Sequence, residues 1–190
     1  LPRLQRILRQ FAVQRPAAAE LQGHEGTPVV LADLEDLNDP RMLQAGDRVA
    51  YIAPNTHAQL ESFYAVPQIG AVLVPLNYRL IADDFAYLIN HSGARIVCAH
   101  SDYLETVESI RAQLPNVSAF VALEGTKPNW LEYETLLAEA PKHFQQAAIH
   151  ETDLLTINYT SGTTARPKGV MITHRNAYIN VIGTLLHHPM

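Results

Sequence analysis

Arg48-Val49-Ala50-Tyr51-Ile52-Ala53 is the first of four short apolar runs in the middle of this 190-residue chain. The others are Ala71-Val72-Leu73-Val74-Pro75-Leu76, Ile96-Val97-Cys98-Ala99 and the stretch from Ser118 to Leu123. Each run has the length and apolar content of a buried strand and is bounded by turn-forming or polar residues. Segments with helical spacing separate the runs. This alternation predicts an α/β fold that consists of βαβ units with a largely parallel sheet.

The intervening helices are indicated by their boundary residues as well as by their apolar spacing. Thr56 is a suitable N-cap for the first helix, and Pro67 should kink or end it. Gly93 fits the position after the end of the second helix. The apolar residues of the four predicted helices are Leu60, Phe63 and Tyr64; Ile81, Phe85, Leu88 and Ile89; Tyr103, Val107, Ile110 and Leu114; and Trp130, Tyr133 and Leu137.

The composition restricts the class of protein. Hydrophobic residues make up 47% of the chain and charged residues 17%, which excludes a disordered tail. No apolar run approaches the ~20 residues that span a bilayer, and the net charge of −5 argues against a partner that is a nucleic acid. Cys98 is the only cysteine, so we expect a cytoplasmic protein in which this thiol is an inert core group. The sequence does not decide whether the protein is a monomer or a homo-oligomer.

The two ends of the chain differ from its middle. Leu4, Ile7, Leu8 and Phe11 predict an amphipathic helix, and residues 20–46 are acidic and rich in turn formers. The chain begins at Leu1 and ends directly after an apolar helical run, so we expect a fragment of a longer protein. Such a fragment should expose apolar surface around Val181, Ile182, Leu185 and Leu186.

Residues 154–174 carry a chemical signature. The apolar run from Leu154 to Tyr159 leads into ten residues rich in Gly and Thr, and Val170-Met171-Ile172-Thr173 follows at once. This pattern predicts two strands joined by a solvent-facing loop. The loop suits a polyphosphate, because Gly162 lets the backbone approach anionic oxygens and free N–H groups can form an anion nest. Hydroxyl groups and one ammonium group are supplied by Thr160, Ser161, Thr163, Thr164 and Lys168.

The loop is close to a Walker A motif but differs from it. Lys168 stands six positions after Gly162, as the motif requires, yet Pro167 precedes the lysine and Gly169 follows it. A strand is expected next, where a Walker A loop opens a helix, so no helix should begin at Lys168. Judged on these residues alone, a Ser/Thr-rich surface loop without a ligand remains an alternative.

The run Tyr159-Thr160-Ser161-Gly162-Thr163-Thr164, with Pro167-Lys168-Gly169-Val170 two residues later, resembles the signature loop of the adenylate-forming (AMP-binding) superfamily. Gly70–Asn77 and His91–Arg95 are also similar to members, and the similarity extends from Gly46 to Leu186. His174–Tyr178 looks most like the acid–CoA ligase (acyl-CoA synthetase) branch. The resemblance implies that the chain is the N-terminal portion of a larger adenylation domain.

The resemblance also implies a two-step reaction. A carboxylic acid, such as a fatty acid, attacks the α-phosphate of ATP to give an acyl-adenylate and pyrophosphate, and coenzyme A then takes the acyl group. The loop would cover the β- and γ-phosphates, with Lys168 and Thr163 as catalytic residues and Thr163 as the Mg²⁺ ligand. The other contacts with ATP would come from Thr160, Ser161, Gly162, Thr164 and Gly169.

Two hypotheses follow for residues 1–190. In the first, they are an incomplete N-terminal adenylation domain that lacks the small C-terminal domain and its catalytic lysine, and the fragment alone is inactive. In the second, they are a non-catalytic truncated protein or pseudoenzyme that keeps the fold. Ala165 stands where many members have glycine, which narrows the conformational range of the loop. The identity of the acid is not encoded in this segment.

Overall fold

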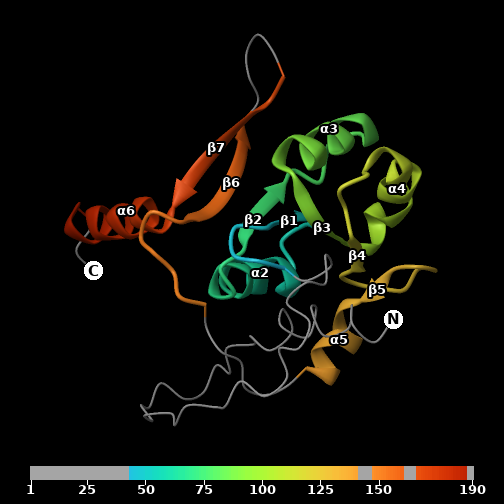
Figure 1. The fold of residues 1–190 in the computed structure, drawn as a ribbon, viewed down its shortest axis with the longest axis horizontal. Helices are drawn as coiled ribbons and strands as arrows, with labels where there is room; N and C mark the ends of the chain where they lie inside the picture. Colours follow the sequence, from blue (N-terminus) through green and yellow to red (C-terminus); the bar gives the residue numbers. More distant parts are fainter. Residues whose placement is uncertain (1–42, 141–146, 161–165, 188–190) are drawn as a thin grey trace.

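A computed structural model describes residues 43–140, 147–160 and 166–187 of the chain. Within them, seven strands form one sheet in the order β5-β4-β3-β1-β2-β6-β7 (Figure 1). All neighbouring strands are parallel except β6 and β7. This arrangement confirms the predicted α/β fold with a largely parallel sheet. The strands are β1 (Arg48–Ile52), β2 (Val72–Leu76), β3 (Ala94–Ala99), β4 (Ala119–Ala122), β5 (Leu131–Glu132), β6 (Leu154–Thr160) and β7 (Lys168–Thr173).

The chain enters the sheet at its centre and extends it in both directions. Ile52 of β1 lies opposite Leu76 of β2 on one side and opposite Ala99 of β3 on the other. The order β2-β1-β3-β4-β5 is that of flavodoxin-like doubly wound folds, in which ligands bind beyond the carboxyl ends of the strands. β6 continues the sheet parallel to β2. Its carboxyl end, Thr160, therefore points in the same direction as the carboxyl ends of β1–β4.

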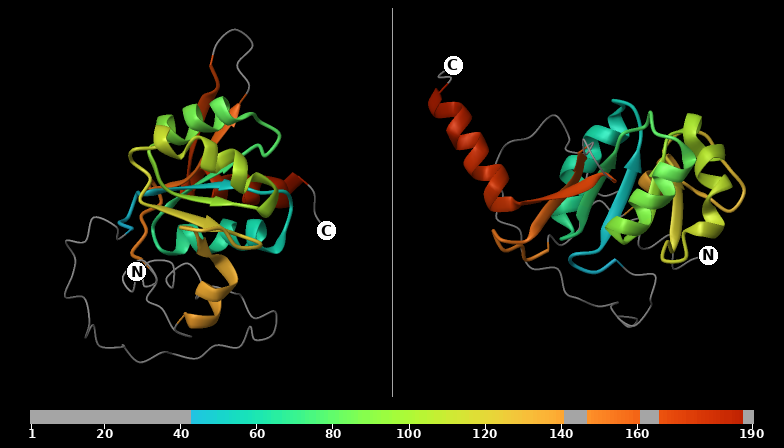
Figure 2. Two further views of the ribbon diagram at one scale, coloured as in Figure 1. Left: turned by 90° about the vertical axis from the view of Figure 1, so that its right-hand side faces the viewer. Right: turned by 90° about the horizontal axis from the view of Figure 1, so that it is seen from above.

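Helices cover both faces of the sheet (Figures 1 and 2). They are α2 (His57–Gln68), α3 (Ala82–Ser92), α4 (Leu104–Ser109), α5 (Tyr133–Glu139) and α6 (His174–His187). Successive residues of each strand point to opposite faces, so Ala50 and Ile52 pack with α3 and α4, whereas Val49 and Tyr51 pack with α2 and α5. Strands buried on both faces explain why the apolar runs are continuous rather than alternating.

Two helix boundaries are formed by the residues that the sequence indicated. The Thr56 hydroxyl accepts a hydrogen bond from the Gln59 N–H and caps α2, which ends one residue after Pro67. Gly93 ends α3 with a left-handed φ of +68°, and its N–H is donated to the carbonyls of Asn90 and Ile89. Glycine adopts this conformation without a steric penalty, which fixes the turn into β3.

The prediction of one continuous helix from Tyr103 to Leu114 was wrong. This segment consists of two single 3₁₀ turns, Ser101–Tyr103 and Arg111–Gln113, on either side of the short helix α4. Nδ1 of His100 accepts the Asp102 N–H and caps the first of these turns, which tightens the start of the segment.

The prediction of a helix that includes Trp130 was also wrong at its start. Leu131 and Glu132 pair with β4 as the edge strand β5, so the helix begins only at Tyr133. Trp130 instead packs against Phe120, with ring centroids 5.2 Å apart, and its indole N–H donates to Glu108 over 2.6 Å. Pairing with the sheet and burial of the indole therefore override the apolar spacing.

The large apolar residues of α2 do not face the sheet. Leu60 is 61% exposed and Tyr64 56%, whereas Ala58, Ala65 and Val66 are buried. Small side chains let the helix approach the sheet closely, and the spacing of large residues alone indicates the opposite face. Ile81, which was assigned to the apolar stripe of α3, is likewise exposed.

Helix α6 extends from the end of β7 away from the sheet (Figure 1). None of its residues is buried, and Val181, Ile182, Leu185 and Leu186 are all exposed, as the sequence predicted. The predicted helix at residues 4–11 and most of the segment 20–46 lie outside the described residues. No helix in the described ranges is both long and apolar enough to cross a membrane.

Candidate functional site

The candidate site is the end of the hairpin that β6 and β7 form. The two strands pair antiparallel, from Leu154 opposite Thr173 to Thr160 opposite Lys168. Helix α6 begins at His174 and not at Lys168. The two predicted strands are thus confirmed, whereas residues 161–165 between them lie outside the described residues. The segment differs from a Walker A motif, because a strand follows the lysine.

Thr160 and Lys168 are the last and first paired residues on either side of the loop, and both are exposed. Among the described residues, no carboxylate forms an ion pair with Lys168, so its ammonium group can bind an anion. The predicted contacts of Ser161, Gly162, Thr163 and Thr164, as well as the effect of Ala165, fall outside the described ranges. Within those ranges, no cluster of three or more His, Cys, Asp or Glu side chains could hold a metal ion.

Gly169 has a packing function in the hairpin. A Cβ atom at this position would lie 3.0 Å from Cγ2 of Ile157 and 3.4 Å from Cε1 and Cζ of Tyr159 on the facing strand. The first distance is shorter than about nine in ten real Cβ contacts, so a side chain here would require Ile157 to shift by a few tenths of an ångström. The sequence suggested Gly169 as an ATP contact; the structure shows a steric reason for glycine here, next to Lys168.

Tyr159 connects the hairpin to α3. Its hydroxyl lies 2.8 Å from Nδ1 of His91, and the two rings meet edge to face with centroids 5.7 Å apart. Partial burial, followed by the nearby Tyr87, raises the pKa of Tyr159, so the phenol stays neutral and can donate its proton to the imidazole. Sequence reasoning missed this contact, since His91 and Tyr159 are 68 residues apart.

Tyr87 lies one helical turn before His91, and it contacts the other side of the loop. Cζ of Arg166 is 5.1 Å from the centroid of the Tyr87 ring, a cation–π distance. The Tyr87 and His91 rings are themselves neighbours, with centroids 5.3 Å apart. The four-residue spacing of Tyr87 and His91 indicates that they lie on the same side of a helix. It does not indicate that Arg166 and Tyr159 are their partners.

The base of the hairpin is held by a different set of contacts. Arg175 pairs with Glu151, and the Arg175 N–H donates to the Glu151 carbonyl over 2.8 Å. Thr173 and Asn176 cap α6 reciprocally: the Asn176 N–H donates to Oγ1 of Thr173, and the Thr173 N–H donates to Oδ1 of Asn176. These contacts fix where β7 ends and α6 begins.

A second group of polar side chains lies at the carboxyl ends of β3 and β4. Nε2 of His100 is 3.2 Å from the Glu124 carboxylate, and the His100 side chain is 12% exposed. Because Nδ1 of the same imidazole caps the turn at Asp102, both ring nitrogens are engaged within the protein. We therefore interpret His100 as a structural residue that joins the carboxyl ends of β3 and β4.

Residues 41–189 match the family model described as AMP-binding enzyme. The chain belongs to this family. The 4-hydroxybutyrate–CoA ligase 2 of Metallosphaera sedula is 35% identical over 156 residues, which cover 76% of this chain and 28% of that protein. The medium-chain-fatty-acid–CoA ligase of Ectopseudomonas oleovorans is 32% identical over 151 residues, with the same coverage of each chain.

A solved structure supports the same assignment of the fold. An anthranilate CoA ligase in complex with anthranoyl-AMP matches with a TM-score of 0.71 and 27% identity, over 74% of this chain and 27% of the other. The resemblance to the AMP-binding family is thus confirmed. This chain spans about 28% of the length of the curated relatives named above.

Proposed function

We propose that these residues are the N-terminal part of the adenylation domain of an AMP-forming acid–CoA ligase. The observation that supports this most directly is the β6–β7 hairpin of an AMP-binding family member. Its two strands end in a hydroxyl group, Thr160, and an ammonium group, Lys168, on either side of the signature loop, and no carboxylate of the described ranges pairs with Lys168. Both lie at the edge of the sheet where doubly wound folds bind ligands.

The proposed reaction begins when a substrate carboxylate attacks the α-phosphate of ATP. The bond between the α-phosphorus and the bridging oxygen of the β-phosphate breaks, and pyrophosphate leaves with the added negative charge. The Lys168 ammonium group stabilises that charge through a charge-assisted hydrogen bond. In the second step the thiol of coenzyme A attacks the acyl carbonyl and AMP leaves.

The residues of the loop have different proposed roles in binding ATP, according to their side chains. Thr160, Ser161 and Thr164 donate hydroxyl protons to phosphate oxygens, while Gly162 and Gly169 allow a close approach of the backbone. The Thr163 hydroxyl is our choice for the Mg²⁺ ligand, because the hard cation prefers oxygen donors and bound phosphate. When bound, Mg²⁺ neutralises part of the triphosphate charge. The exposed Thr160 and Lys168 fit an anionic ligand of this kind.

We further propose a fatty acid as the substrate and the cytoplasm as the location, with a homo-oligomer as an option for assembly. The medium-chain-fatty-acid–CoA ligase among the relatives supports the choice of substrate. We also propose that the 190-residue chain alone is inactive, since it spans only about 28% of these relatives and presents one wall of a site. Positioning contributes roughly 7–11 kcal/mol to such reactions, and an open half-site loses it.

Acid-dependent exchange of radiolabelled pyrophosphate into ATP tests the proposal. The complete protein that contains these residues should catalyse exchange with at least one acid in a panel of C2 to C16 monocarboxylates. The 190-residue chain should not. Absence of exchange with every acid in the complete protein would favour the non-catalytic hypothesis. Exchange by the 190-residue chain at ordinary enzymatic rates would show that the site is complete within it.

A further inference from the structure

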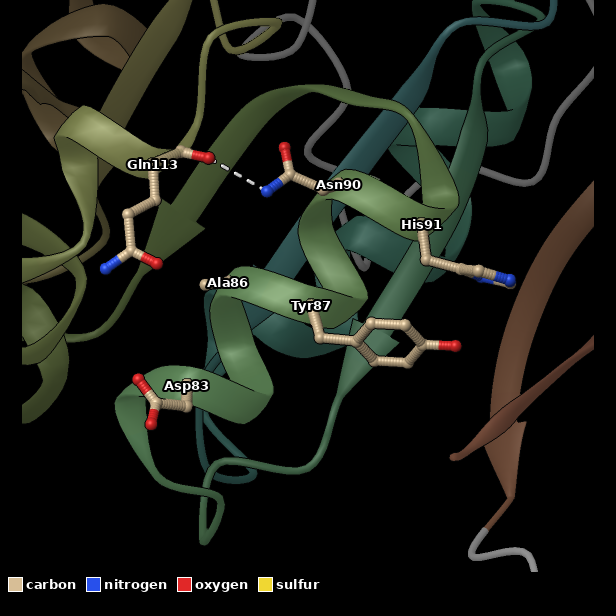
Figure 3. Close-up of a pocket in the computed structure, with 6 residues that line it drawn as sticks. All are labelled: Asp83, Ala86, Tyr87, Asn90, His91 and Gln113. Atoms are coloured by element: carbon tan, nitrogen blue, oxygen red, sulfur yellow. Dashed lines mark hydrogen bonds between the residues drawn. The ribbon is translucent and has the colours of Figure 1, made fainter. Parts of the chain in front are cut away.

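The side of α3 that carries Tyr87 and His91 faces the signature hairpin. Tyr87 is half-buried against the core cluster, whereas His91 is exposed. Figure 3 shows both side chains extending from one side of the helix toward the ribbon of the hairpin. Tyr87 and His91 line a groove of about 540 Å³ on α3. The other polar side chains of this groove do not extend toward the hairpin. Asn90, for example, donates its side-chain N–H to the Gln113 carbonyl over 2.9 Å.

We propose that His91 and Tyr87 are positioning residues for the phosphate-binding loop, acting on its two ends through Tyr159 and Arg166. This inference rests on the proposed function of the hairpin. His91 contacts Tyr159, the residue before Thr160, and Tyr87 contacts Arg166, two residues before Lys168. The two helical side chains thus reach both ends of the loop from one rigid element.

The hairpin is attached to the rest of the fold by the pairing of β6 with β2 and by the packing of Ile157 and Tyr159 on the core. Leu73 opposite Thr156 is the register pair that joins β6 to β2, and it lies four residues before Thr160. Beyond this pair the hairpin projects past the edge of the sheet beside α3 (Figure 1). Ile157 is the one residue of the described hairpin that is buried. The contacts with α3 therefore act together with these attachments in setting the position of the loop end relative to the core.

The effect of His91 reaches Lys168 through a short path. The Tyr159 ring, which contacts His91, also lies close to Gly169: Cε1 and Cζ of the ring would be 3.4 Å from a Cβ atom at that position. Gly169 is bonded to Lys168, and Tyr159 is bonded to Thr160. A shift of the Tyr159 ring therefore displaces both groups that we assign to the phosphates, without a change in either residue.

The test compares three replacements of His91 in the complete protein. His91→Leu removes the hydrogen bond, His91→Asn keeps a polar atom near the place of Nδ1, and His91→Gln places one near Nε2 instead. We expect His91→Leu and His91→Gln to lower kcat/KM for ATP in pyrophosphate exchange by roughly 3–10-fold, the value of one neutral hydrogen bond. His91→Asn should recover most of the loss, and the KM for coenzyme A should not change.

Two further variants separate positioning from general stability. Asn90→Ala disturbs the same helix without touching the hairpin and should leave kcat/KM for ATP unchanged. The double variant His91→Leu, Tyr159→Phe should be no worse than Tyr159→Phe alone, because both replacements remove the contact between His91 and Tyr159, and Tyr159→Phe also removes a hydrogen bond with Ser92. Amide hydrogen exchange at residues 157–160 and 166–170 should increase in His91→Leu while the melting temperature stays within about 2 °C of the wild type.

Equal activity of His91→Leu and wild type would overturn the inference. So would a loss in Asn90→Ala that matches the loss in His91→Leu, or a loss that Asn does not recover and that follows the melting temperature. A wild-type protein without exchange activity would overturn the proposed function alone. Hydrogen exchange would then still show whether His91 holds the hairpin.

Discussion

Replacement of Gly169 by alanine tests whether this glycine is required by packing. The added Cβ would meet Cγ2 of Ile157 at 3.0 Å and the Tyr159 ring at 3.4 Å. Ile157 is 7% exposed and packs in the core, so it cannot move aside easily. Overpacking of this kind costs about 1–3 kcal/mol. For a chain of this size, each kcal/mol lowers the melting temperature by roughly 2–4 °C.

We therefore expect Gly169→Ala to lower the melting temperature by about 2–12 °C, measured by circular dichroism and differential scanning calorimetry. Gly183→Ala is the matched control. Gly183 lies inside α6 with no atom within 4 Å of an added Cβ, so the same substitution should stabilise its helix by up to about 1 kcal/mol. The two variants make the same chemical change and are expected to have effects of opposite sign.

Unchanged or increased stability of Gly169→Ala would refute this reasoning, since alanine normally stabilises a compatible site by about 0.4–1 kcal/mol. A second arm locates the cause. Ile157→Leu lacks the Cγ2 methyl group, so the double variant Gly169→Ala, Ile157→Leu should lose less stability than the sum of the single variants. Strict additivity would place the strain elsewhere in the hairpin.

Four other outcomes can be measured. In the complete protein, Lys168→Ala should lower kcat/KM for ATP by about 10–150-fold, because a hydrogen bond to a charged group contributes roughly 1.5–3 kcal/mol. The melting temperature should change little. Normal ATP use with a large loss of stability would contradict this prediction. Partial burial raises the pKa of Glu108, but hydrogen bonds from Trp130 and Arg111 outweigh this effect and lower the pKa below 4.5. The contribution of Glu108 to the free energy of unfolding is therefore present above pH 4.5 and is lost as the pH falls through the lower folded pKa. Urea titrations should show a smaller loss of stability at acid pH for Glu108→Gln than for the wild type. Burial raises the pKa of Cys98 to about 12, so at pH 8 only about one thiol in ten thousand is ionised and a chromogenic disulfide should label the protein only after unfolding. The 190-residue chain should self-associate through the exposed apolar side of α6, and Leu185→Lys should shift it toward monomer in analytical ultracentrifugation.

The sequence predicted the strands well because a strand buried on both faces is a local pattern. The runs at 48–53, 71–76, 96–99 and 118–123 all correspond to strands within a residue or two. Thr56 and Gly93 also act through local geometry and were recognised for that reason. The β6–β7 hairpin belongs to the same class, since Val170-Met171-Ile172-Thr173 favours a strand wherever it is placed.

The errors arise where a distant partner decides the outcome. Leu60 and Tyr64 have the spacing of a buried stripe, yet the flat sheet accepts the small residues of α2 instead. Trp130 fits a helical pattern, but its contacts with Phe120 and Glu108 hold it outside the helix. For the candidate site, the motif gave the chemical groups. It gave no indication of His91, which only the fold brings next to Tyr159.

The buried core and the proposed phosphate site lie in different parts of the chain. The buried core lies in β1–β4 and the helices that cover them, whereas in the described hairpin only Ile157 is buried and α6 buries nothing. The hairpin is attached to the sheet by the pairing of β6 with β2 and by the packing of Ile157 on the core. Charge stabilisation of a leaving group requires donors that are already in place when the bond breaks. If the loop binds phosphate as we propose, the contacts of α3 with Tyr159 and Arg166 help to hold it in place, because they join both ends of the loop to a helix whose inner side, through Phe85, Leu88 and Ile89, is fully buried.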